Sequence, residues 1–177
     1  MKLFILVDQL HSHGGIEKLV ALKANYWSTV FGYEVVVVAT EQGGLPLVYP
    51  LDSGVSFVDL QVAYQRQKSY FSFANLLLLG QNIWRLQRLL FQHQPDVILV
   101  ASHIPVTYVL PFMVRRKAVL AKEFHYTKFF DSLVGIKAKV LHFIESRYDY
   151  LVVLSAEERR FYPSKQVVVI PNPIVDA

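Results

Sequence analysis

The sequence contains no cysteine, which excludes disulfide bonds and metal sites built on thiolates. It is also poor in charge, because only 18% of its 177 residues are Asp, Glu, Lys or Arg while 53% are hydrophobic. A chain with this balance must bury many segments on both faces. That favours a parallel sheet covered by helices over an antiparallel sheet with one wet face. The length is typical of a single domain with a substantial core.

Long apolar runs are missing as well. The run at residues 76–79 leads into Arg85 and Arg88, so no stretch is long enough to span a membrane. The apolar start at residues 3–7 ends at Asp8 without a small-residue cleavage site, which predicts a buried strand rather than a signal peptide. The net charge is +4, but the basic residues are scattered, so we expect no nucleic-acid partner. We expect a cytoplasmic protein.

Several motifs of nucleotide and hydrolase chemistry are absent. The chain lacks G-x-G-x-x-G, a phosphate loop and G-x-S-x-G. Glu41 follows a predicted strand as a ribose-binding carboxylate does, but no fingerprint precedes it. Ser155 is explained as a helix cap paired with Glu158. His11 and His13 have no Asp or Cys at ligand spacing, so we expect no metal site.

The hydrophobic pattern alternates between strands and helices. Apolar runs predict strands at residues 3–7, 33–39, 55–60, 96–101, 118–124, 151–154 and 166–170. Helical spacing predicts helices at 16–31, 72–93, 105–114 and 133–148 and a short one after Ser155, with Pro111 a possible kink and Gly32 a helix cap. This alternation predicts an α/β fold with a Rossmann-like, doubly wound parallel sheet of about seven strands and helices on both faces.

Three groups follow predicted strands and should meet at one rim of the sheet, where such folds bind ligands. They are the loop 11–15, Ser102 with His103, and His125 with Tyr126. Gly14 and Gly15 stand where a helix begins, so they leave the backbone N–H groups open to an anion. The alternatives remain a plain tight turn and ordinary surface histidines.

Aromatic and basic residues alternate around position 68. Arg66, Lys68, Tyr70 and Phe71 would suit a membrane interface, with cations on lipid phosphates and aromatic rings inserted. The competing interpretation is a loop whose aromatic side chains pack on the core, which is the more common fate of such residues.

Six fragments together resemble the N-terminal domain of GT-B-fold glycosyltransferases of family four, which are retaining enzymes. They occur in the family's order along nearly the whole chain. The fragments are Gly-Gly-Ile-Glu-Lys at 14–18, Phe-Gly-Tyr-Glu-Val at 31–35, Pro-Asp-Val-Ile at 95–98, Phe-His at 124–125, Leu-Val-Val-Leu-Ser at 151–155 and Val-Ile-Pro-Asn at 169–172. Two positions depart from the pattern, because Tyr33 replaces a histidine and Pro173 replaces a glycine.

The resemblance implies roles for particular residues. Gly14, Gly15 and Ile16 would lie near the donor diphosphate and the acceptor, with His103 and Tyr126 beside them. His125 would contact the donor sugar as the catalytic residue. The donor would be a UDP- or GDP-sugar, and no metal or other cofactor is implied. The reaction is attack of an acceptor hydroxyl on the anomeric carbon with retention.

The resemblance also implies a division of labour between domains. Residues 1–171 would form the acceptor-side domain and 172–177 the start of a linker, with the donor-binding C-terminal domain absent. The chain alone would then be inactive. Its parent would be a hexosyltransferase acting on a glycan or lipid-linked acceptor in cell-envelope polysaccharide synthesis, cytoplasmic or peripheral on the inner membrane face. The alternatives are a free-standing nucleotide- or sugar-binding module and, less well matched, half of a nicotinamide-dependent oxidoreductase.

Overall fold

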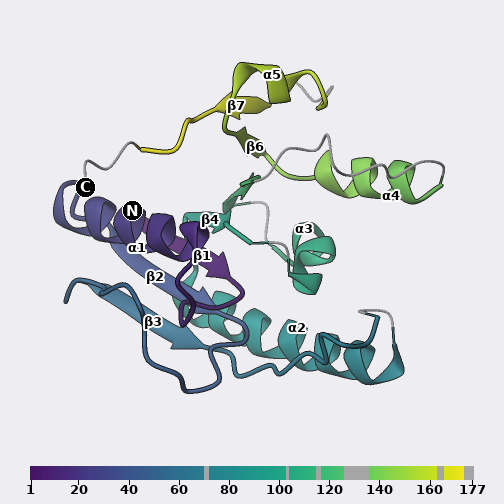
Figure 1. Cartoon of the computed structure of the whole chain (residues 1–177), viewed down its shortest axis with the longest axis horizontal. Coiled ribbons are helices and arrows are strands. Elements are labelled where there is room, and N and C mark those ends of the chain that lie inside the picture. Colours follow the sequence, from purple (N-terminus) through teal and green to yellow (C-terminus); the bar gives the residue numbers. More distant parts are fainter. Residues whose placement is uncertain (70–71, 103, 115–116, 126–135, 163–165, 174–177) are drawn as a thin grey trace.

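The structure is an α/β fold with one seven-stranded parallel sheet (Figure 1). The computed structural model describes residues 1–69, 72–102, 104–114, 117–125, 136–162 and 166–173. The strands are β1 Lys2–Val7, β2 Glu34–Ala39, β3 Val55–Asp59, β4 Val97–Val100, β5 Val119–Glu123, β6 Tyr150–Val153 and β7 Val167–Val169. Their order in the sheet is β3-β2-β1-β4-β5-β6-β7, all parallel. The predicted Rossmann-like sheet is therefore confirmed.

The order of the strands reverses between β1 and β4. From β1 the chain moves outward to β2 and β3, and it then crosses back to place β4 on the other side of β1. A crevice for ligands forms outside the carboxyl ends of the strands at such a switch point. The fold thus marks the ends of β1 and β4 as the place to look for a site.

Helices cover the sheet from both sides. The described helices are α1 Gly15–Thr29, α2 Phe73–His93, the 3₁₀ helix η1 Pro105–Tyr108, α3 Leu110–Met113, α4 Ile136–Glu145 and α5 Ala156–Arg159. One buried cluster joins α1 to side chains such as Ile5 and Val37. The other joins α2, α3 and α4 to side chains such as Phe4 and Val36. Successive side chains of one strand therefore point into two different cores, as expected for strands that are buried on both faces.

Turns and helix ends lie where the sequence predicts them, except around Pro111. Gly32 has a φ of 63°, which suits glycine where the chain turns after α1. Ser155 caps α5 by accepting from the Glu158 N–H. The helix predicted at 105–114 is divided into η1 and α3, and Pro111 falls in the first turn of α3. Proline lacks the N–H that a continuous helix needs, so it starts a new segment instead of kinking one.

Helix α2 differs from its predicted pattern. Leu86 is buried and Leu79 and Ile83 pack against the core as expected. Helical spacing would place Leu76 on the same face as Leu79 and Ile83, but it is 46% exposed. Fully buried Asn75 lies one position earlier and faces inward in its stead. Apolar periodicity cannot anticipate a buried asparagine, because its burial depends on hydrogen bonds to a distant loop.

Candidate functional site

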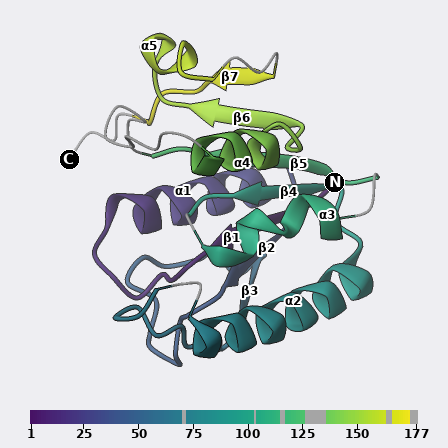
Figure 2. The ribbon, with the colours of Figure 1, turned by 90° about the vertical axis from the view of Figure 1, so that its right-hand side faces the viewer.

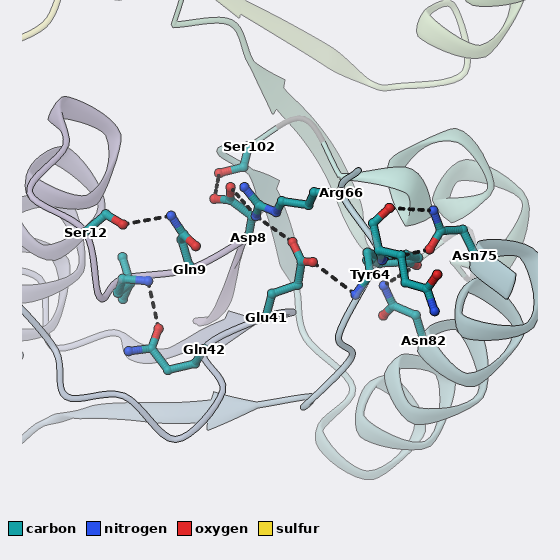
Figure 3. A network of polar contacts seen from close by, with 12 residues as sticks. Asp8, Gln9, Ser12, Glu41, Gln42, Tyr64, Arg66, Asn75, Asn82 and Ser102 are labelled. Carbon is teal, nitrogen blue, oxygen red and sulfur yellow. Dashed lines mark hydrogen bonds and ion pairs between the residues drawn. The ribbon is translucent and has the colours of Figure 1, made fainter. Parts of the chain in front are cut away.

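A polar network joins the carboxyl ends of β1, β2 and β4 at the switch point (Figure 3). The Ser102 hydroxyl donates to Asp8 Oδ1 at 2.9 Å, which connects the end of β4 with the end of β1. The Arg66 guanidinium donates to Asp8 Oδ2 at 3.3 Å and to Glu41 Oε2 at 2.6 Å. We call Asp8, Glu41, Arg66 and Ser102 the rim network. It places two carboxylates and a cation beside the crevice.

The loop between β3 and α2 carries Arg66 to this rim, and α2 holds the loop. Asn75 accepts from the Gln65 N–H at 2.9 Å and donates to the carbonyl groups of Gln65 and Ser69 at 3.2 and 3.0 Å. Asn82 donates to the Tyr64 hydroxyl at 3.1 Å (Figure 3). Both asparagines are fully buried, so each hydrogen bond is shielded from competing water. The loop is thereby fixed before a ligand arrives.

A second polar cluster lies at the end of β5. Lys23 of α1 reaches Glu123, with 2.6 Å between Nζ and Oε1. The other carboxylate oxygen of Glu123 lies 3.4 Å from His125 Nε2. The Glu123 and His125 side chains are each only 6% exposed. We call Lys23, Glu123 and His125 the β5 triad. It ties the helix that follows β1 to the tip of β5.

The electrostatics of the β5 triad keep Glu123 ionised. Burial acts to raise the pKa of Glu123, but contact with His125 and the charge of Lys23 outweigh it and leave that pKa below its ordinary value. His125 itself has two buried ring nitrogens, and neither meets hydrogen-bond geometry with any partner in the described part of the chain. The 3.4 Å contact with Glu123 is thus an electrostatic one. A buried nitrogen without a hydrogen bond lowers the stability of the folded chain. Two such nitrogens in one ring therefore indicate that the ring can bind a ligand.

The two glycines before α1 differ in what surrounds them. A Cβ on Gly15 would have no atom within 4 Å, so the backbone there is open as predicted. A Cβ on Gly14 would fall 2.0 Å from Glu17 Oε2, because that buried carboxylate folds back over the helix start. The Ile16 side chain packs into the core on the α1 side, leaving its backbone as the part that can meet a ligand. The backbone at Gly15 is therefore open in this structure, whereas the backbone at Gly14 is covered by the end of the Glu17 side chain.

Only some of the remaining predicted site residues lie in the described part of the chain. His103, Tyr126, Tyr70 and Phe71 lie outside the described residues. Lys68 is exposed. Arg66 contacts two carboxylates at the rim, a role that its aromatic and basic surroundings did not suggest. Asp8 was also missed, although an acidic residue directly after a buried strand was a usable signal.

Neither a metal-binding cluster nor a membrane-spanning helix is found among the described residues. No group of three His, Cys, Asp or Glu side chains in the described ranges could hold a metal ion. His13 packs edge-on against Tyr49 with ring centroids 6.3 Å apart, and His11 Nδ1 is buried without a hydrogen-bond partner among the described residues. Among the helices described, none combines the length and apolar character needed to cross a bilayer.

Solved structures share this fold at low identity. Sucrose-phosphate synthase from Thermosynechococcus elongatus has a TM-score of 0.70 at 14% identity, and the match covers 96% of this chain and 47% of that protein. The apo form of the lipopolysaccharide outer core galactosyltransferase WaaB has a TM-score of 0.67 at 11% identity, covering 98% and 46%. A UDP-GlcNAc 2-epimerase from Neisseria meningitidis bound to UDP-GlcNAc has a TM-score of 0.60 at 15% identity, covering 97% and 47%.

These similarities show the fold, and the chain spans about half the length of each of these proteins. A search of curated proteins finds no match. The sequence profile described as Glycosyltransferase Family 4 matches residues 13–177, which contain both Gly15 and the β5 triad. The chain therefore belongs to glycosyltransferase family 4.

Proposed function

We propose that this chain is the acceptor-side domain of a retaining glycosyltransferase that moves a hexose from a UDP- or GDP-sugar to a glycan or lipid-linked acceptor. The family match supports sugar transfer. The similar epimerase is bound to UDP-GlcNAc, and the similar WaaB acts on the lipopolysaccharide outer core, which supports a nucleotide-sugar donor and a cell-envelope acceptor. The proposed location is the cytoplasm, and no cofactor beyond the nucleotide sugar is required.

The β5 triad is the observation that carries this proposal. In the proposed reaction His125 contacts the donor sugar with a ring nitrogen that has no bond within the described chain. The carboxylate of Glu123, held ionised by its neighbours, favours the positive charge that develops on the sugar in the transition state. Lys23 keeps Glu123 in place at 2.6 Å and so acts as a positioning residue.

Departure of the nucleoside diphosphate needs a site for negative charge. The first N–H groups of α1 have no partners inside the helix, and the open backbone at Gly15 leaves room for an anion to approach them. Glu17 would turn away from the helix start when a diphosphate binds, because its carboxylate lies over Gly14 and like charges repel. The rim network would meet the acceptor, since its carboxylates can accept hydrogen bonds from sugar hydroxyls.

A second domain is proposed to complete the site. Val119, Tyr150 and Val168 lie on the α1 side of β5, β6 and β7 by their register, and each is 38–45% exposed. Parallel sheets are usually covered on both faces, so these apolar side chains favour a further part of the enzyme packed there. In this proposal residues 1–171 form one domain and 172–177 begin the linker to the donor-binding domain.

Sugar-nucleotide epimerisation is the second candidate, because an epimerase shares the fold at comparable similarity. An enzyme that contains this domain should be incubated with UDP- and GDP-hexoses, with and without lipid-linked and soluble glycan acceptors. Transfer that requires an acceptor and gives a product of the donor's anomeric configuration by NMR is the expected result. Conversion of the sugar nucleotide without any acceptor would overturn the proposal in favour of epimerisation. Binding without chemistry would favour a non-catalytic module.

A further inference from the structure

Helix α2 exposes large apolar side chains along its whole length. Phe73, Leu77, Trp84 and Phe91 are 60–78% exposed, and Leu76 is 46% exposed. At 3.6 residues per turn, the first four point within about 40° of one another around the helix axis. We call these five residues the outer stripe. A group of exposed large apolar side chains on one side of a helix usually marks a surface that meets another apolar phase.

The outer stripe is additional to the face that α2 uses for folding. Leu79, Ile83 and Leu86 pack into the core from another side of the helix, and Leu76 stands at the edge between the two sides. Figure 2 shows α2 along the outer margin of the molecule, at the end of the sheet away from β7. A helix that is apolar on two sides is expected to lie between two partners, and the described part of the chain covers one of these sides.

The charges around the outer stripe indicate what kind of surface would cover it. No Asp or Glu occurs between Leu60 and Asp96, whereas this segment contains Arg66, Lys68, Arg85 and Arg88. Arg66 is paired with the rim carboxylates, and Arg85 donates to the backbone carbonyl groups of Leu60 and Gln61. Lys68 and Arg88 are exposed and form no ion pair with the described residues. The Arg88 guanidinium lies 5.9 Å from the Trp84 ring centre.

This combination favours an anionic lipid surface over a second copy of the chain. Exposed Phe and Trp side chains insert at the level of lipid headgroups, and neighbouring Lys and Arg bind the phosphates. Two copies joined through the same face would bring together two surfaces that carry cations and no carboxylate between residues 61 and 95, so no ion pair from this segment would form across the contact.

We propose that the outer stripe of α2 docks on an anionic membrane surface, with Lys68 and Arg88 at the lipid phosphates. The inference does not depend on the sugar-transfer proposal. It gives that proposal a route to a lipid-linked acceptor, because Asn75 in the first turn of α2 bonds the loop that carries Arg66 to the rim. A lipid surface against the outer stripe would therefore be connected with the rim network through α2, whose buried face holds the loop.

The test uses the fluorescence of Trp84. The chain has two tryptophans, and Trp27 is partly buried against the core, so Trp27→Phe leaves Trp84 as the single reporter. Vesicles of phosphatidylcholine with and without phosphatidylglycerol are added to this variant. A blue shift of the emission and quenching by brominated lipid, both confined to the anionic vesicles, are expected. Neither signal with anionic vesicles, or equal signals with neutral ones, would overturn the proposal.

Sedimentation with anionic vesicles then separates the contribution of the aromatic side chains to membrane binding from that of the cations. Phe73→Ser combined with Phe91→Ser should lower the partition coefficient at least tenfold, because two exposed rings lose their apolar contact. Lys68→Gln combined with Arg88→Gln should lower it about twenty-fivefold, or about fivefold per cation. The matched control is Tyr26→Ser combined with Phe31→Ser, two exposed aromatics near the end of α1, which should leave partition unchanged.

Two outcomes of this series would contradict the proposal. One is an equal loss in the control pair, which would mean that exposed aromatic residues bind vesicles wherever they lie. The other is a blue shift of Trp84 that grows with protein concentration without lipid, together with a doubled mass in sedimentation velocity, which would assign the stripe to a second copy. Circular dichroism of each variant should match that of the parent chain, because every substituted side chain in the series except Trp27 is exposed.

Discussion

Replacing Lys23 with methionine tests the β5 triad by removing one charge while keeping the aliphatic stem. The Glu123 side chain is 6% exposed and that of Lys23 is 19% exposed, so the pair is largely buried. Removing one partner of a buried ion pair costs about 3–5 kcal/mol. Because His125 still lies 3.4 Å from Glu123 and Lys23 is partly exposed, we expect a loss at or just below the bottom of this range, about 2–3 kcal/mol. The urea midpoint should then fall by about 1–1.5 M for a slope near 2 kcal/mol per M.

The pH dependence of this loss gives the sharper check. In the parent chain the pKa of Glu123 lies below its ordinary value of 4.5, so the ionised carboxylate adds stability above that pH, which is lost as pH falls through the folded pKa. Without Lys23, burial is opposed by His125 alone and the pKa of Glu123 moves upward. The variant should therefore be most destabilised near neutral pH, and less so at acid pH, where Glu123 binds a proton in the variant.

Urea titrations followed by circular dichroism at neutral and mildly acid pH measure both effects. Lys18→Met is the matched control on the same helix, because Lys18 is exposed and should tolerate the change within about 0.5 kcal/mol. The double variant Lys23→Met with Glu123→Gln should recover part of the loss, since no uncompensated buried charge remains. A loss for Lys23→Met below about 0.5 kcal/mol, or an equal loss at both pH values, would refute the reasoning.

Three further predictions concern the helices and the glycine loop. Leu86→Ala should lower the free energy of unfolding by about 2–5 kcal/mol because Leu86 is fully buried, as thermal and urea denaturation will show. Asn75→Ala removes three hydrogen bonds to the loop before α2 and should cost about 1–3 kcal/mol, with faster amide exchange at residues 65–69 as the specific sign. Gly15→Ala should leave the melting temperature unchanged or slightly raised, whereas Gly14→Ala should lower it by displacing Glu17; equal effects would contradict the geometry of this loop.

The sequence predicts the fold well because the strands are continuous apolar runs. Four consecutive valines at 35–38 can hardly form anything but a buried strand, and the alternation with helices fixes a parallel sheet. Helix boundaries follow from Gly32, Pro105 and Ser155, whose local chemistry acts within a few residues. Such signals do not depend on distant contacts, which is why they can be recognised without the structure.

The polar parts of the site are predicted only in part. His125 was identified from its place after a strand, but its partner Lys23 is 100 residues from Glu123 and lies on another element. The aromatic neighbours of Arg66 suggest a membrane contact or a loop packed on the core, while its contacts with Asp8 and Glu41 depend on where the strands before them end in the sheet. The outward-facing apolar residues of α2 were hidden for the same reason, since periodicity does not tell which of two apolar sides faces the core.

The central claim is that His125 acts in sugar transfer, and the turnover number of an enzyme containing this domain tests it most directly. His125→Ala should lower kcat about a hundredfold or more with the fold intact, as expected when one preorganised contact to the reacting sugar is lost. His142→Ala is the matched control, because His142 is an exposed histidine on α4 and its loss should leave kcat unchanged. An unchanged kcat for His125→Ala, in a protein whose circular dichroism is that of the parent, would contradict the account.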